Sequence, residues 1–256
     1  MSERLDKVLV LRGLVESREK GKKAIEEGRV FVNGEVVTVS KHSVEEDDVV
    51  IVEGNDQYVS RAAGKLKGAL DAFNINLNGK QCLDIGASTG GFTQVCLEYG
   101  ATNVIALDVG YGQLHPSIES DERVIVMEKY NFRYAQEEDF AWRCDFFCSD
   151  VSFISLKLII PSLECCVSES SEGVLLIKPQ FEAGSAFVDK HGVVKKKEVH
   201  VRVIQDIIDF VQVHGFGILG LSKSVVIGKS GNQEYLLYIK KNSASKSIDI
   251  TKVVMD

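Results

Sequence analysis

Short apolar runs alternate with amphipathic segments through most of the chain after residue 80. Five of these runs predict β-strands, at residues 82–86, 103–108, 124–127, 145–149 and 173–178. Helix-like segments lie between them, and strands that alternate with helices predict a doubly wound, mostly parallel α/β sheet. A long amphipathic helix is expected over residues 197–213. The last two strand-like runs, 217–227 and 234–240, have no clear helix between them, which predicts a closing antiparallel hairpin.

The first fifth of the chain shows a shorter and different pattern. Apolar spacing predicts one short helix over residues 5–12 and a second helix that starts after Ser17 and stops at Gly28. Two short apolar runs then flank Asn33-Gly34, and Asn-Gly between such runs is a strong signal for a tight β-hairpin. These elements predict a small α+β domain ahead of the α/β sheet.

The change of pattern near residue 54 predicts the domain organisation. We expect the small domain at residues 1–54, a short polar linker at 55–59 and the α/β domain at 60–241. The polar residues that open the segment 242–256 predict a weakly ordered C-terminal tail there.

Composition narrows the class of protein. With 45% hydrophobic residues and only 3 prolines, the 256-residue chain is expected to form ordinary globular domains. Most of the six cysteines lie in apolar runs, and their spacing is not typical of a zinc site, so we expect buried free thiols and no metal. There is no apolar signal core and no apolar stretch of ~20 residues, which predicts a soluble cytoplasmic protein.

Charge is distributed unevenly over the N-terminal region. The net charge of −7 argues against non-specific coating of nucleic acid, but residues 1–30 hold eight Lys and Arg against six Asp and Glu. Residues 31–60 hold one Lys against seven Asp and Glu. One interpretation is that a basic face of this region contacts phosphate while an acidic face contacts water. The alternative is a solvated helix with an ordinary run of charged residues.

A glycine-rich turn follows the first strand of the predicted sheet. The strand that contains Asp84 runs into Gly86-Ala87-Ser88-Thr89-Gly90-Gly91-Phe92, where a helix begins. Glycines let a backbone approach a ligand closely, and a helix N-terminus offers unpaired N–H donors. The next strand ends at Asp108, 22 positions after Gly86, close to the spacing of about 20 at which a Rossmann-type unit binds ribose hydroxyls. The pattern predicts a nucleoside-binding βαβ unit.

Three polar residues lie at the ends of apolar strands, at the edge where open α/β sheets bind their ligands. They are Asp150, Lys178 and Glu234. A lysine directly after four apolar residues and before Pro179 is uncommon without a carboxylate partner. Each of the three could also be a strand cap or part of a surface ion pair, and Lys65 could be an ordinary exposed helix lysine.

The segment from Ser17 to Gly34 resembles the RNA-binding domain of the ribosomal protein S-four type, because a helix, a basic run, a glycine stop and an Asn-Gly hairpin occur together. The resemblance implies that basic side chains of this domain contact RNA phosphates. The residues expected to bind RNA are Arg4, Arg18, Lys22, Lys23, Arg29 and, at the start of the second domain, Arg61.

Further blocks extend the resemblance over the whole chain. They are Ser60–Leu66, Leu83–Phe92, Ser149–Leu156, Leu176–Glu182 and Gly231–Tyr235. In this order they resemble the TlyA family of S-adenosylmethionine-dependent ribosomal RNA 2′-O-methyltransferases, which is related to the FtsJ type. The resemblance implies a Rossmann-like Class I methyltransferase domain behind the small RNA-binding domain. It also implies ribosomal RNA in ribosomal subunits as the partner and cytidine as the target. We expect no membrane partner, and the sequence indicates no obligate protein partner.

The family's catalytic set of two lysines and two carboxylates falls here on Lys65, Asp150, Lys178 and Glu234. Lys178 is the expected base for the ribose hydroxyl, with Lys65 favouring loss of its proton and the two carboxylates orienting the lysines. The expected contacts of S-adenosylmethionine are Asp84, Gly86, Ala87, Ser88, Gly90, Gly91, Phe92, Asp108, Val109 and Asn131. Asp108 is expected to bind the ribose hydroxyls, and Asn131 belongs to the expected adenine pocket.

Two other functions stay open at this point. The haemolysin names of some family members suggest a membrane-active protein, although the amphipathic segment 197–213 is typical of a helix that packs on a sheet. The second is an RNA-binding ribosome-assembly factor with an inactive methyltransferase fold, although the chain keeps all four polar positions and the glycine loop.

Overall fold

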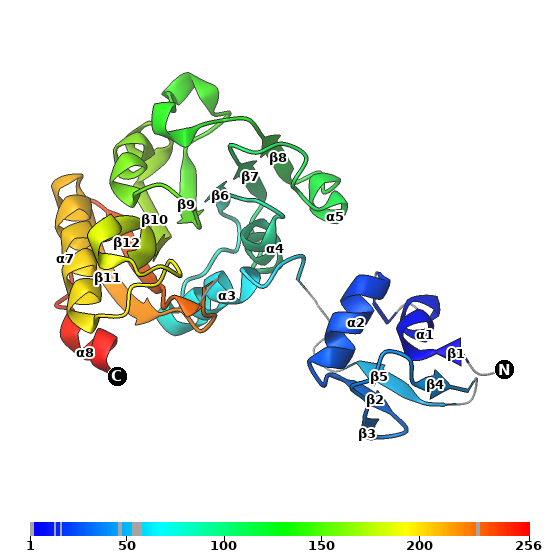
Figure 1. The fold of residues 1–256 in the computed structure, drawn as a ribbon. Helices are drawn as coiled ribbons and strands as arrows, with labels where there is room; N and C mark the ends of the chain where they lie inside the picture. Colours follow the sequence, from blue (N-terminus) through cyan, green and yellow to red (C-terminus); the bar gives the residue numbers. More distant parts are fainter. Residues whose placement is uncertain (1–2, 13, 16, 46–47, 53–57, 229–230) are drawn as a thin grey trace. The chain divides into compact units, whose positions relative to one another are not determined.

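The computed structural model describes most of the chain. The described residues are 3–12, 14–15, 17–45, 48–52, 58–228 and 231–256. The chain separates into two compact units, Met1–Gln57 and Tyr58–Asp256, which Figure 1 shows as a blue unit and a cyan-to-red unit. Most of the predicted linker at 55–59 lies outside the described residues.

Two short helices and two small sheets build the first unit. Its elements are β1 (Glu3–Arg4), α1 (Leu5–Leu11), α2 (Arg18–Glu26), β2 (Val30–Val32), β3 (Glu35–Val36), β4 (Ser43–Val44) and β5 (Val50–Val52). Strands β3, β2 and β5 form one sheet in that order, and β1 pairs with β4. Apolar side chains of both helices, β2 and β4 pack together, so this unit has a hydrophobic core of its own.

Two local signals in the first unit act as the sequence predicts. The Ser17 side chain accepts a hydrogen bond from the Lys20 backbone N–H and so caps α2. Asn33 and Gly34 both have positive φ angles, 52° and 85°, as a tight turn between two strands requires. The antiparallel pairing of β2 with β3 confirms the predicted hairpin.

A seven-stranded sheet forms the centre of the second unit (Figure 1). Its strands are β6 (Gln81–Ile85), β7 (Asn103–Leu107), β8 (Val124–Met127), β9 (Cys144–Ser149), β10 (Val167–Ile177), β11 (Phe216–Lys223) and β12 (Tyr235–Lys241). The order is β11-β12-β10-β9-β6-β7-β8. Strands β10, β9, β6, β7 and β8 are parallel, whereas β12 is antiparallel to β10 and β11. The predicted α/β sheet with its closing hairpin is confirmed.

Helices cover both faces of this sheet. Side chains of successive strand residues point to opposite faces, so each strand has apolar side chains for the helices on either side. The α-helices are α3 (Ala63–Phe73), α4 (Gly91–Glu98), α5 (Pro116–Glu119), α6 (Pro179–Glu182), α7 (Lys197–Val213) and α8 (Ile250–Met255). Short 3₁₀ helices are η1 (Phe132–Tyr134), η2 (Glu137–Asp139), η3 (Leu156–Leu158), η4 (Ile160–Cys165) and η5 (Ser185–Phe187). In β6, Cys82 packs with the apolar side of α3 and α4, whereas Leu83 and Ile85 pack with α7 and α8. The loops at the carboxyl ends of the parallel strands are left to form a site.

Three regions differ from the sequence prediction. Strand β11 ends at Lys223, so the last four residues of the expected run 217–227 lie outside it. Strand β10 begins at Val167 instead of near residue 173, with an irregular register in its first half. The prediction of a weakly ordered tail over 242–256 is wrong for its last turns, which form α8. Ile250 and Val254 of this helix are buried in the same core as α7, so apolar burial orders the segment.

Candidate active site

Strand β6 leads into a turn that depends on glycine. Gly86 and Gly90 have φ angles of 87° and 91°, a region that residues with a Cβ atom rarely adopt. A Cβ atom on Gly86 would lie 3.1 Å from the Asp150 carbonyl oxygen, and one on Gly90 would lie 2.9 Å from Leu114 Cδ1. The two glycines therefore let the loop pass close to the end of β9 and to α5 before α4 begins.

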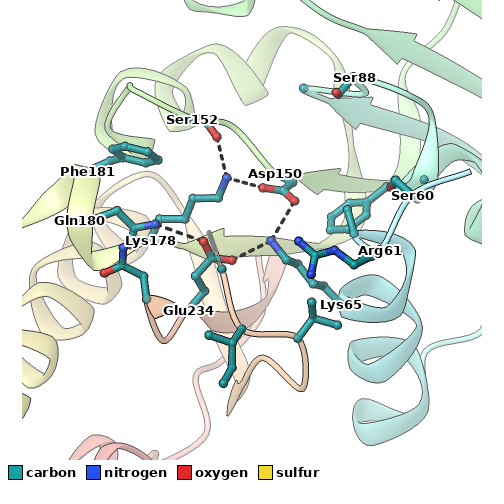
Figure 2. A pocket seen from close by; sticks show the side chains of 18 of the residues that line it. Ser60, Arg61, Lys65, Ser88, Asp150, Ser152, Lys178, Gln180, Phe181 and Glu234 are labelled. Carbon is teal, nitrogen blue, oxygen red and sulfur yellow. Dashed lines mark hydrogen bonds and ion pairs between the residues drawn. The ribbon is translucent and has the colours of Figure 1, made fainter. Parts of the chain in front are cut away.

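A cavity of about 570 Å³ lies against this loop. On the loop it is lined by Gly86, Ala87, Ser88, Thr89, Gly91 and Phe92. It is also lined by four charged residues whose side chains point toward one another in Figure 2, namely Lys65, Asp150, Lys178 and Glu234. One space thus joins the predicted cofactor loop to the predicted catalytic residues.

The four charged residues come from distant parts of the chain. Lys65 lies on α3, Asp150 follows β9, Lys178 follows β10, and Glu234 precedes β12. Lys178 Nζ lies 2.5 Å from Asp150 Oδ1, and Lys65 Nζ lies 3.3 Å from Asp150 Oδ2. Lys65 Nζ also lies 2.7 Å from Glu234 Oε2. Lys65, Lys178 and Glu234 are only 8%, 7% and 3% exposed, so each ammonium needs the carboxylate that it contacts.

Neutral side chains fix the direction of these charged groups (Figure 2). Ser152 Oγ accepts a hydrogen bond of 2.8 Å from Lys178 Nζ. Gln180 Nε2 donates a hydrogen bond of 3.2 Å to Glu234 Oε1. The Phe181 ring centre lies 5.8 Å from Lys178 Nζ. These contacts restrict the side chains that would face a substrate, which is the geometric condition for acid–base chemistry.

Comparisons with known proteins identify the family. Residues 58–241 match the FtsJ-like methyltransferase family, and residues 3–50 match the S4 domain. YqxC of Bacillus subtilis, which is named as an rRNA methyltransferase, is 45% identical over 239 residues, or 93% of this chain and 85% of YqxC. TlyA of Mycobacterium tuberculosis, named as a 16S/23S rRNA (cytidine-2′-O)-methyltransferase, is 41% identical over 93% of this chain and 89% of TlyA. The chain belongs to the TlyA family of FtsJ-like methyltransferases.

A solved structure supports the same placement. A solved structure from Streptococcus thermophilus, which bears a hemolysin name, shares 38% sequence identity with this chain and superimposes with a TM-score of 0.78. The match covers 99% of this chain and 94% of the Streptococcus thermophilus chain. As a member of the TlyA family the protein is a methyltransferase, and its cofactor is S-adenosylmethionine.

The glycines of the loop let neighbouring parts of the protein pack closely against it. A Cβ atom on Gly91 would collide with Ser60 Oγ, which lines the same cavity. Next to the loop, Asp108 accepts hydrogen bonds from the backbone N–H groups of Ser88 at 2.8 Å and Gly110 at 2.7 Å. Each carboxylate oxygen accepts more than one hydrogen bond, so Asp108 keeps acceptor capacity for ribose hydroxyls.

Some residues predicted to contact the cofactor do not line the cavity. They are Asp84, Gly90, Asp108, Val109 and Asn131. Gly90 shapes the turn, as described above, and Val109 is exposed. The Asn131 side chain accepts a hydrogen bond from the Arg133 backbone N–H and caps η1. Direct contacts of these residues with S-adenosylmethionine stay predictions.

Asp84 lies beneath the loop rather than beside the cavity. Its side chain is fully buried, and its Oδ2 accepts a hydrogen bond of 2.7 Å from Thr93 Oγ1. Burial away from water raises the pKa of the Asp84 carboxyl to about 7, although the bond from Thr93 opposes this shift. Asp84 therefore binds Thr93 of α4, the helix that follows the loop, and keeps a proton that an exposed carboxyl would lose.

The raised pKa of Asp84 makes the stability of the second unit depend on pH. The folded state keeps a proton that the unfolded chain releases near pH 4, so the contribution of Asp84 to the unfolding free energy falls as pH rises from about 4 to about 7. Asp84→Asn removes this titration and keeps an acceptor for Thr93. We expect the variant to gain on the order of 3 kcal/mol over the parent between pH 4.5 and 7.5. Urea unfolding at both pH values measures the difference, and parallel stability curves would contradict the assignment.

The predicted RNA-binding residues of the first unit make local ion pairs. Arg4 Nε and Arg18 Nη2 lie 3.0 and 2.7 Å from the two oxygens of Asp6, a fully buried carboxylate. These arginines lower the pKa of Asp6 to about 2 although its burial acts in the opposite direction. Both arginine side chains are still partly exposed, so each has donors left for phosphate. They have a structural role besides the predicted one.

The other predicted RNA-binding residues divide between the two units. Arg29 pairs with Glu27 at 2.8 Å, and Lys23 lies 3.9 Å from the same carboxylate. Lys22 is exposed on α2. Arg61 belongs to the second unit, where it is exposed and lines the cavity. The structure therefore places one predicted RNA contact at the candidate active site itself.

The sequence prediction omits several residues that line the cavity. Among them are Ser152, Phe153, Gln180 and Asn232. All four lie inside the sequence blocks that carry Asp150, Lys178 and Glu234, so proximity to those residues was the available signal. The contacts that these residues make in the cavity depend on the fold, and no periodic pattern in the sequence predicts them.

All six cysteines are free, and five are buried, as the sequence predicts. Among the described residues, no helix is long and apolar enough to cross a bilayer.

Proposed function

We propose that this protein transfers a methyl group from S-adenosylmethionine to a ribose 2′-hydroxyl of ribosomal RNA, with cytidine as the target. The observation that carries the proposal is the paired arrangement of Lys65, Asp150, Lys178 and Glu234 in the cavity that also contains the glycine loop. The names of TlyA and YqxC support the same substrate class. The S4 domain supports structured RNA, in ribosomal subunits of the cytoplasm, as the partner.

The chemistry requires a base and an aligned acceptor. A ribose hydroxyl is a weak nucleophile, and S-adenosylmethionine supplies an electrophilic methyl group when bound. In its neutral form, Lys178 Nζ would accept the hydroxyl proton while the hydroxyl oxygen gains the methyl group, and the methyl–sulfur bond of the sulfonium donor would break to leave a neutral thioether. Lys65, held by Asp150 and Glu234, adds a second positive group that stabilises the developing oxyanion. Alignment of the acceptor within the cavity supplies a further part of the acceleration.

Lys65 and Lys178 have different partners, and this difference suits the separate roles of charge stabilisation and base. Asp150 touches both ammonium groups, whereas Glu234 touches only Lys65 among the charged residues described. Lys178 instead has the Ser152 hydroxyl as its second partner. Lys65, which two carboxylates hold, suits the charge-stabilising role. We assign the base to Lys178.

The direct test is transfer of labelled methyl groups by the purified full chain to ribosomal subunits from cells that lack this protein. We expect the label in rRNA, on the ribose 2′-oxygen of cytidine. Label in base rings or protein would overturn the proposed acceptor. Absence of transfer together with absence of S-adenosylmethionine binding would favour an inactive RNA-binding factor. Lysis of vesicles by detergent-free protein would favour the membrane-active alternative.

A further inference from the structure

The segment before helix α7 concentrates positive charge in a chain whose net charge is −7. Residues 190–197 contain four lysines and no acidic residue. Lys190, Lys195 and Lys196 are all exposed. We call Asp189–Lys196 the cationic loop, because three of its eight residues are lysines.

Local pairing accounts for only part of this charge. Lys195 Nζ lies 2.8 Å from Asp189 Oδ2, and Lys197 Nζ donates a hydrogen bond to the Met255 carbonyl oxygen. Within the described part of the chain, Lys190 and Lys196 have no ion-pair partner. Lys196, the N-cap residue of α7, also gains nothing from the helix dipole, which disfavours cations there. Fold stability therefore does not explain these two lysines.

The cationic loop is fixed to the candidate active site through Asn232. The backbone N–H of Val194 donates a hydrogen bond of 3.2 Å to Asn232 Oδ1, and Asn232 Nδ2 donates one of 2.8 Å to the Gly192 carbonyl oxygen. Asn232 is buried, two residues before Glu234, and both Asn232 and Gly192 line the cavity.

A second anchor holds the loop from the side of α7. His200 is buried, and its Nε2 lies 2.7 Å from the Val194 carbonyl oxygen. Inside the loop, Asp189 Oδ1 accepts hydrogen bonds from the backbone N–H groups of His191 and Val193. These bonds order the backbone, so the exposed lysines have a defined place beside the cavity mouth.

We propose that Lys190 and Lys196 bind phosphates of the RNA strand that carries the target nucleotide, an inference that rests on the proposed function. A nucleotide whose ribose enters the cavity keeps its flanking phosphates outside, next to the cavity rim. Lysine suits these groups because an ammonium is a point charge that binds phosphate oxygens in many orientations. The contacts carry no sequence information, and they draw the strand toward Glu234 and Lys178.

The experiment uses the full chain in which both lysines are neutralised, Lys190→Gln with Lys196→Gln. The matched control is Lys240→Gln with Lys246→Gln. Lys240 lies at the end of β12 opposite to Glu234, and the backbone N–H of Lys246 is bonded to Ile218 of β11, whose partner in β12 is Ile239. Binding of a deproteinised rRNA fragment is measured from 50 to 300 mM salt, together with methyl transfer and S-adenosylmethionine affinity.

We expect the Lys190/Lys196 variant to bind the RNA about tenfold more weakly near 100 mM salt, with a salt slope reduced by about 1.4. KM for RNA should rise while kcat and cofactor affinity stay near parental values, and the control should match the parent. Parental affinity and salt slope in the variant would overturn the phosphate contact. Equal losses in the control would also overturn it, since net charge alone would then explain the change. A parent that binds RNA but transfers no methyl group would refute the proposed function, while the salt slopes would still decide the phosphate contact.

Discussion

Lys178→Ala should abolish detectable methyl transfer while leaving S-adenosylmethionine binding nearly unchanged. Loss of a general base lowers turnover by about 10²- to 10⁴-fold, and Lys178 is also one of the two ammonium groups that meet at Asp150. The cofactor loop Gly86–Phe92 lies on a different part of the cavity and does not depend on this side chain. Calorimetry with S-adenosylmethionine and single-turnover transfer to rRNA measure the two effects separately.

Lys178→Arg distinguishes a base from a charge at this position. A guanidinium stays protonated at any working pH, so it keeps the positive charge but accepts no proton. If Lys178 is the base, the Arg variant should be as inactive as the Ala variant. Substantial turnover by Lys178→Arg would show that positive charge suffices and would reject the base assignment. Lys240→Ala, on the far end of β12, controls for loss of a lysine in this domain.

Gly228→Ala should lower turnover by about 100-fold through displacement of Glu234. A Cβ atom at position 228 would collide with Glu234 Oε1 and lie 2.8 Å from its Cδ. The carboxylate would have to leave its present position, in which Oε1 accepts the hydrogen bond from Gln180 and Oε2 lies 2.7 Å from Lys65 Nζ. Displacement of a catalytic group by about 1 Å costs rate on this scale. Single-turnover transfer at saturating RNA measures the loss, and cofactor affinity should be retained.

Gly68→Ala is the matched control for that substitution. Gly68 lies on α3, one turn from Lys65, and an added Cβ would meet only the exposed Val225 side chain at 3.2 Å. This valine can move, so the control should fold and turn over like the parent. Full activity in Gly228→Ala would mean that the placement of Glu234 has little importance. Equal losses in both variants would point to the packing of α3 instead.

Periodic and turn signals predicted the fold well because they express local rules. Short apolar runs predicted the strands of the large sheet, and Asn33-Gly34 predicted the hairpin of the first unit. The absence of a helix between the last two strands predicted their antiparallel pairing. In each case the residues that predict the element are the same residues that form it.

The C-terminal helix shows where such reasoning ends. α8 has only six residues, and two of them, Ile250 and Val254, are buried against the rest of the core. Six residues are too few to show a helical period, and a helix of that length is stabilised by packing rather than by its own propensity. The polar residues ahead of it predicted disorder because the partner surface on α7 and β11 is invisible in the local sequence.

The charged site was predictable only in part for a related reason. Asp150 and Lys178 stand out because each follows an apolar strand, but Lys65 looks like any other helix lysine. It meets Asp150 and Glu234 across 85 and 169 positions of sequence, and only the resemblance to the TlyA family selected it. The bond from Gln180 to Glu234 spans 54 positions in the same way. Contacts at such separations are set by the order of strands in the sheet.

Mapping of 2′-O-methylated nucleotides in rRNA from cells with and without this protein tests the proposed function most directly. We expect at least one cytidine that carries the mark only when the protein is present. The mark should return with the parent chain and stay absent with Lys178→Ala produced at the same level. Identical ribose-methylation maps in the two cell lines would contradict the central claim.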